Sequence, residues 1–173
     1  MRIGTKSLLF GCHQIIIHPI FTTIAWVQLY GWCSFGWKSS LVIFFHDWGY
    51  WGCREMDGPD GSVHPINLPR RLLSILMTLL PFEMMCEIYN HSRHLCHKNG
   101  WTPSRLCWAD KLGTALMPSW LWAVMAYSSR EGWEYMDNIY GNDYVRGDEH
   151  TLRGLIQFHK KYKVQYNWRE EGK

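Results

Sequence analysis

An adjacent histidine and aspartate, His46 and Asp47, follow directly on the apolar run Leu41–Phe45. A continuous apolar run of this kind indicates a buried segment, so the His-Asp pair is expected to lie in the interior. A buried imidazole and a buried carboxylate each cost free energy unless a partner compensates them. A divalent metal ion is the most economical partner, and the fold is therefore expected to bring further ligands to this pair.

Glycine and proline residues divide the chain into segments that are typical of helices. Alternation of apolar and polar residues, the pattern of a half-buried strand, is scarce. Thr102-Pro103 is expected to open a helix that carries Asp110 and ends at Pro118. The other helices are predicted at about residues 15–30, 38–47, 65–80, 83–98 and 119–139. The sequence thus predicts an all-α fold, a compact helical bundle with a metal site in its core.

The length of 173 residues suits one domain with a real core. We expect a single domain over residues 1–173, with its core at about 13–140 and a basic C-terminal extension at 141–173. The last 23 residues are rich in lysine and arginine and are expected to form a solvated tail.

The overall charge and the cysteines limit the classes of function. A formal net charge of +3 is too weak to indicate stable binding to nucleic acid. The six cysteines contain no Cys-x-x-Cys pair, so we expect reduced thiols in a cytoplasmic protein rather than a disulfide framework or a zinc ribbon.

An uncharged stretch raises the alternative of a membrane-associated protein. From Ser7 to Trp37 there is no Asp, Glu, Lys or Arg, and this is longer than the ~20 residues that span a bilayer. The stretch nevertheless contains several polar residues, and Pro19 stands beside His18 near its middle. A buried helix of a soluble protein is therefore favoured, with no membrane as partner.

Further candidate ligands are spaced widely along the chain, so each is expected on a different helix or helix end. A helical bundle can bring such side chains to one internal point. His18, His46, Asp47 and Asp110 suffice for one ion. Adding His64 and His91 gives enough donors for a second ion, with Asp47 and a hydroxide as bridges. Histidine-rich sites suit Mn, Fe, Co, Ni or Zn, and Mg is also compatible.

The order of these residues resembles the HD superfamily of metal-dependent phosphohydrolases. The resemblance covers about residues 13–122, and the segment from Ser104 to Lys111 is similar to the final Ala-Asp-Lys helix of these proteins. It rests on His18-Pro19, His46-Asp47-Trp48-Gly49-Tyr50, His64-Pro65, His91-Ser92-Arg93 and Ala109-Asp110-Lys111-Leu112. The six-ligand pattern looks like the binuclear branch, which includes symmetric diadenosine-tetraphosphate hydrolases and cyclic-dinucleotide phosphodiesterases. The chain also resembles uncharacterised HD-like proteins of bacteria and phages. Trp51 stands where the Gly-Tyr-Pro phosphodiesterase group has its proline.

The resemblance implies an enzyme that hydrolyses a nucleotide phosphoester or phosphoanhydride through a metal-activated hydroxide. It implies a catalytic role for Asp47 as the bridging ligand. Arg93, two residues after His91, and Lys111, directly after Asp110, are the candidate catalytic groups that stabilise the charge on phosphate, with a surface ion pair as the alternative for each. Asp57 is a candidate lid residue or proton carrier. A small-molecule nucleotide is the expected partner, and a homo-oligomer is compatible with the family.

Each candidate also has a structural interpretation. His18 alone would be a core histidine bonded to backbone, and His64 could simply end a turn. His91 and His94 could form a separate zinc site, although His94 and His97 are expected to face solvent. Trp48, Tyr50 and Trp51 could stack on a base or simply pack. A protein that binds a metal or a nucleotide without turnover is the main alternative function.

Overall fold

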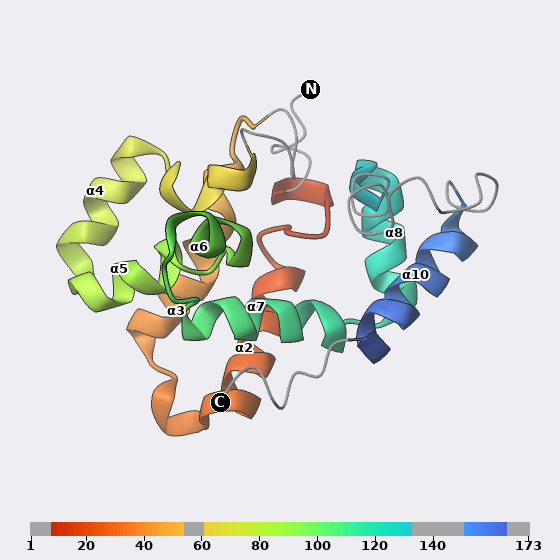
Figure 1. Cartoon of the computed structure of the whole chain (residues 1–173), viewed down its shortest axis with the longest axis horizontal. Helices are drawn as coiled ribbons and strands as arrows, with labels where there is room; N and C mark the ends of the chain where they lie inside the picture. The colour runs from red at the N-terminus through yellow and green to blue at the C-terminus, as the bar shows by residue number, and fades with distance from the viewer. Residues whose placement is uncertain (1–7, 54–60, 133–150, 166–173) are drawn as a thin grey trace.

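The computed structural model describes residues 8–53, 61–132 and 151–165, and in these ranges every regular element is helical (Figure 1). The all-α prediction is therefore confirmed. The α-helices are α2 (Ile17–Tyr30), α3 (Trp37–Phe45), α4 (Arg70–Leu79), α5 (Phe82–Tyr89), α6 (Arg93–Asn99), α7 (Arg105–Leu116), α8 (Ser119–Ser129) and α10 (Leu152–Gln165). Short 3-10 helices are η1 (Trp32–Ser34), η2 (His46–Tyr50) and η3 (Gly61–Ile66).

Helices α2 and α7 form the centre of the molecule and pack closely along their length. Their close approach depends on Gly113, because a Cβ at this position would lie 2.8 Å from the backbone of Thr22. Helices α3 and α5 complete the main core around them. Its fully buried side chains include Ala25, Trp26, Val42, Ile43, Leu76, Ile88, Leu106 and Ala109. This core holds α2, α3 and α7 in fixed relation, and these are the elements that lead to the candidate ligands.

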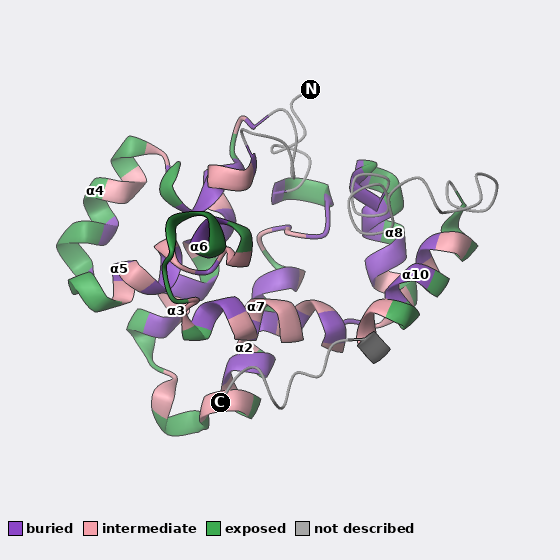
Figure 2. Cartoon of the chain, in the orientation of Figure 1, coloured by how far each residue is buried: buried purple, intermediate pink, exposed green. Residues whose placement is uncertain are grey.

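Helices α8 and α10 lie side by side at one end of the molecule, as Figure 1 shows. Figure 2 shows buried residues along the faces by which they meet. Trp122 of α8 packs against Leu155 and Phe158 of α10 in a second buried cluster. The expectation of a solvated tail is therefore wrong for residues 152–163, because burial of these apolar side chains stabilises a docked helix.

Two predicted long helices are each divided into two. Instead of one helix over 65–80, η3 ends at Ile66 and α4 begins at Arg70 after Pro69. Instead of one helix over 83–98, α5 ends at Tyr89 and α6 begins at Arg93. Ser92 accepts a hydrogen bond from the backbone of Leu95, at 3.3 Å, and so provides the N-cap that starts a new helix.

The helix that carries Asp110 also begins later than predicted. Ser104, not Thr102, is its N-cap and accepts a hydrogen bond from the backbone of Cys107. The predicted helix over 119–139 corresponds to α8, which ends at Ser129. Residues 133–150 and Asp57 lie outside the described part of the chain.

The uncharged stretch from Ser7 to Trp37 is divided within the fold. Its described part contains α2, with 14 residues, and the short η1. None of the helices in the described ranges has both the length and the apolar character needed to cross a membrane.

Candidate metal centre

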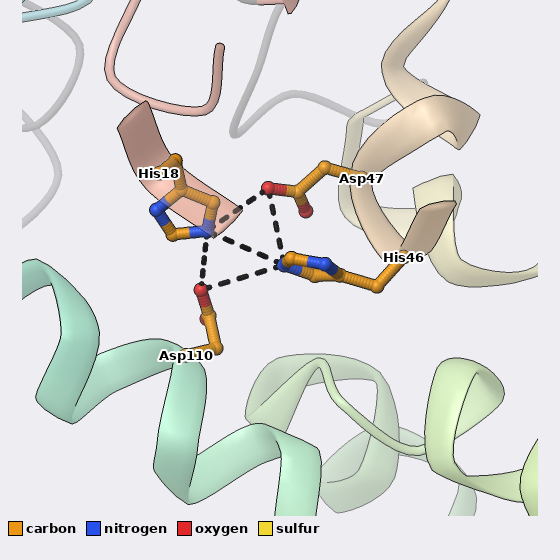
Figure 3. Close-up of side chains that lie close together, drawn as sticks. All are labelled: His18, His46, Asp47 and Asp110. Atoms are coloured by element: carbon orange, nitrogen blue, oxygen red, sulfur yellow. Dashed lines mark hydrogen bonds and ion pairs between the residues drawn. The ribbon is translucent and has the colours of Figure 1, made fainter. Parts of the chain in front are cut away.

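Four of the six predicted ligands meet in the interior, each held by an element that is anchored in the main core (Figure 3). His18 lies in the first turn of α2, and Asp110 lies in α7. His46 and Asp47 begin η2, directly after α3. His46 is 0% exposed, His18 1% and Asp47 4%. The apolar run before the His-Asp pair thus carries it inside, as the sequence predicts.

The polar atoms of these four residues form one tight group. The Nε2 atom of His18 is 2.9 Å from Asp110 Oδ1 and 3.3 Å from Asp47 Oδ2. The Nε2 atom of His46 is 3.3 Å from Asp47 Oδ2 and 3.6 Å from Asp110 Oδ1. The two imidazole nitrogens are themselves 3.3 Å apart (Figure 3). Four candidate ligand atoms therefore surround one point.

The other two predicted ligands form a second group on the opposite oxygen of Asp47. His64 Nε2 is 3.6 Å from Asp47 Oδ1, and His91 Nε2 is 3.4 Å from the same oxygen. His64 lies in η3, whereas His91 lies in the break between α5 and α6. The structure thus brings all six predicted residues together, with Asp47 shared between the two groups.

Three of the histidines are oriented in the same way. The Nδ1 atom of each is close to the carbonyl oxygen three residues earlier: His46 to Ile43 at 2.7 Å, His64 to Gly61 at 2.7 Å and His91 to Ile88 at 2.6 Å. A carbonyl oxygen can only accept a hydrogen bond, so Nδ1 must carry the hydrogen and donate it in each case. In the neutral form of each ring the lone pair of Nε2 then points toward Asp47, which is the orientation of a histidine that binds a metal.

The His64–His91 contact is the clearest physical sign that this cluster can bind a cation. Their Nε2 atoms are only 2.8 Å apart. Because both rings use Nδ1–H on a carbonyl, two neutral rings would oppose lone pair to lone pair at this distance. A proton or a metal ion between them removes the repulsion. Burial, and then the neighbouring His91, hold the pKa of His64 well below its usual value, which favours the metal over the proton.

The spacing and the unsatisfied atoms both fit a metal ion. Two ligand atoms about 2.1 Å from one ion lie about 3.0 Å apart at a right angle and about 3.4 Å apart at a tetrahedral angle. The separations within the two groups, 2.8 to 3.6 Å, span these values. Asp47 Oδ2 and Asp110 Oδ1 are buried without a hydrogen-bond partner, and such atoms are costly unless an ion or water binds them.

Electrostatics keep the two carboxylates in the form that binds a metal. Burial alone would raise the pKa of Asp47, but His46 and the other imidazoles around it reverse this and lower it. Burial likewise raises the pKa of Asp110, but the adjacent imidazoles of His18 and His46 outweigh it and hold this pKa well below its usual value. Burial lowers the pKa of His46, yet Asp47 and Asp110 outweigh it and raise this pKa to about 9. A metal that binds His46 must therefore displace a proton.

A small pocket adjoins this centre at Asp110. It is lined by His13, Asp110, Lys111, Thr114, Trp122, Phe158, His159 and Tyr162. Lys111, a predicted phosphate-binding residue, thus lies beside the centre. Arg93, the other, opens α6 and is half-buried, but it is not among the residues that line this pocket.

The remaining candidates have structural positions. His94 and His97 are exposed, as predicted. Tyr50 is buried and stacks on His64, with ring centroids 3.8 Å apart, so it packs against a candidate ligand. Trp48 packs against Phe45 at 5.0 Å.

Sequence reasoning missed His13 and the side chains of α10. His13 lies just before α2, and its ring centroid is 5.2 Å from that of His18. His159 of α10 is 0% exposed and lines the same pocket. The apolar spacing of Leu155 and Phe158 within the basic segment was the signal that could have identified α10 as a packed helix.

Comparison of the chain with protein-family models, with curated proteins and with solved structures found no match. The helical fold and the buried His/Asp cluster are compatible with an HD-like site.

Proposed function

We propose that the protein is a metal-dependent phosphohydrolase that holds two divalent transition-metal ions and cleaves a nucleotide phosphoester or phosphoanhydride. The observation that carries this proposal is the position of Asp47, whose Oδ2 faces His18 and His46 and whose Oδ1 faces His64 and His91. One carboxylate between two groups of histidines is the donor arrangement of a two-metal site.

The side chains divide the work at this site. His18, His46, Asp47 and Asp110 would hold one ion, and His64, His91 and Asp47 the other. Divalent ions, when bound, activate water for attack at phosphorus and neutralise the developing charge. The three Nδ1–H bonds to backbone carbonyls orient the imidazoles, and burial excludes competing water.

Two basic side chains are assigned to the substrate. Lys111 follows Asp110 in α7 and lies on the wall of the adjoining pocket, where its charge stabilises a phosphate. Arg93 follows His91 by two residues, and it is the second candidate for phosphate contact.

The test is metal reconstitution coupled to a nucleotide panel. The protein is stripped with a chelator and reloaded with Mn²⁺, Fe²⁺, Co²⁺, Zn²⁺ or Mg²⁺, and release of phosphate or nucleoside is measured. Asp47→Ala is expected to abolish turnover while its helical circular dichroism remains. His97→Ala, an exposed histidine of α6, is the matched control and is expected to keep full activity.

Two results would reject the proposal. Equal rates for Asp47→Ala and the wild type would separate the reaction from the cluster. Binding of metal and nucleotide without any turnover would instead favour the alternative function, a protein that sequesters its ligand.

A further inference from the structure

The pocket between α7, α8 and α10 meets the metal centre at Asp110, and Lys111 lies on its wall. Asp110 is the more accessible carboxylate of the cluster, with a side-chain exposure of 14% against 6% for Asp47. The carboxylate that borders this pocket is therefore the one that solvent reaches more readily, so a ligand in the pocket would lie against the centre.

We propose that this pocket is the subsite for one unsubstituted phosphoryl group, so that the substrate is a phosphate monoester or a terminal phosphate rather than a diester. The inference rests on the proposed function, because it takes the reacting phosphorus to lie at the metal centre.

The size of the pocket favours a single phosphoryl group. Its volume is about 80 Å³, which is more than the ~10–15 Å³ that a single water molecule occupies. The pocket therefore has room for a small group such as phosphorus with its four oxygens. A nucleoside is several times larger. A diester would have to place one of its two bulky substituents here, whereas a monoester leaves its only substituent outside.

The wall that limits this volume is rigid. Trp122 stacks on His159 with ring centroids 4.8 Å apart and planes at 13°, and on Phe158 at 5.7 Å and 21°. His159 accepts from Ser119 Oγ at 3.1 Å through Nδ1 and donates through Nε2–H to Thr114 O at 2.9 Å. These three rings are at most 2% exposed. These rings are therefore held in place by other groups of the protein, and moving them to admit a larger substituent would disrupt close packing.

The charge of the lining favours an anion. Lys111 is the only lysine or arginine among the described lining residues, and burial lowers the pKa of His159 to about 4. Bound divalent ions would outweigh the charges of Asp47 and Asp110. A monoester dianion gains more from this surplus of positive charge than a diester monoanion does.

Calorimetric binding of inorganic phosphate to the Mn²⁺-loaded protein tests the subsite directly. Lys111→Met is expected to weaken phosphate binding by about tenfold or more, the usual effect of losing one charged hydrogen bond. Thr114→Leu, which fills the pocket, is expected to weaken it comparably. Lys98→Met removes an exposed lysine of α6 that does not line the pocket, and it is expected to bind phosphate as the wild type does.

Hydrolysis of p-nitrophenyl phosphate and of bis(p-nitrophenyl) phosphate tests the substrate class in the same samples. The monoester is expected to be cleaved faster. The subsite is overturned if the wild type does not bind phosphate, if Lys111→Met binds it unchanged, or if the diester is cleaved as fast as the monoester. Turnover that persists in those cases leaves the proposed function standing. Phosphate binding that depends on Lys111, with no turnover of either ester or of the nucleotide panel, supports the subsite and rejects the proposed function.

Discussion

Asp47→Asn should remove most of the thermal stabilisation that metal gives this protein. An ion that binds only the folded state at 100 times its Kd stabilises by about 2.7 kcal/mol. In a chain of 173 residues, each kcal/mol raises Tm by about 2–4 °C. Saturation of one site should therefore raise the Tm of the wild type by about 5–11 °C.

The size of the loss follows from the shared position of Asp47. Its substitution removes one charged ligand from both groups at once and leaves the group of His64 and His91 with none. Changes even to the outer partners of ligands weaken metal binding by about 10–100-fold. At the same metal concentration, a 100-fold loss leaves about 0.4 kcal/mol of stabilisation, or about 1–2 °C in Tm.

Differential scanning fluorimetry with and without Mn²⁺ measures this difference within each variant, so an effect on the metal-free protein cancels. His94→Ala, an exposed histidine on α6, is the control and should keep the full wild-type shift. An unreduced shift in Asp47→Asn would show that the cluster is not where the metal binds, and would refute the reasoning.

Three further predictions concern packing and pH. Gly113→Ala would force α7 away from Thr22, so we expect the free energy of unfolding, measured in urea, to fall by about 1–3 kcal/mol. Metal titration should show weaker binding, and unchanged values in both measurements would contradict the close packing. A Cβ at Gly49 would overlap the carbonyl of His64, so Gly49→Ala should lower the metal content per chain. Burial lowers the pKa of His159 to about 4. The stability that its buried neutral ring contributes is therefore fully present above pH ~6.5 and is lost as pH falls toward 4. Between pH 7 and 5 the free energy of unfolding should fall by about 1–2 kcal/mol less in His159→Gln than in the wild type. An equal fall in both proteins would show that protonation of His159 does not control this pH dependence.

The candidate site was more predictable from the sequence than the fold around it. His46 and Asp47 follow an apolar run, and burial of unpaired polar groups is costly enough to require partners. That argument does not depend on helix boundaries. The convergence of His18 and Asp110 on this pair follows from the same requirement.

The boundaries near His91 could not be read in the same way. No glycine or proline stands between Tyr89 and Arg93, so the segment reads as one helix. Ser92 caps the new helix locally, and the break also depends on a tertiary contact: the carbonyl of Asn90 accepts from the backbone of Ser104 at 3.0 Å. Such a bond forms only after α7 has packed, and no local pattern records it.

The C-terminal segment was misread for another reason. Its lysines and arginines dominate the composition, yet α10 buries Leu155 and Phe158 on one face. Lys163 also donates to the carbonyl of Met117 at 2.6 Å, at the end of α7. A net basic count therefore hides an amphipathic helix that completes the wall of the pocket.

Anomalous diffraction from crystals of the Mn²⁺-loaded protein tests the central claim most directly. We predict two peaks about 3.5–4 Å apart on either side of Asp47, one bound by His18, His46 and Asp110 and the other by His64 and His91. A peak at neither position, or metal bound only elsewhere on the chain, would contradict the two-metal centre.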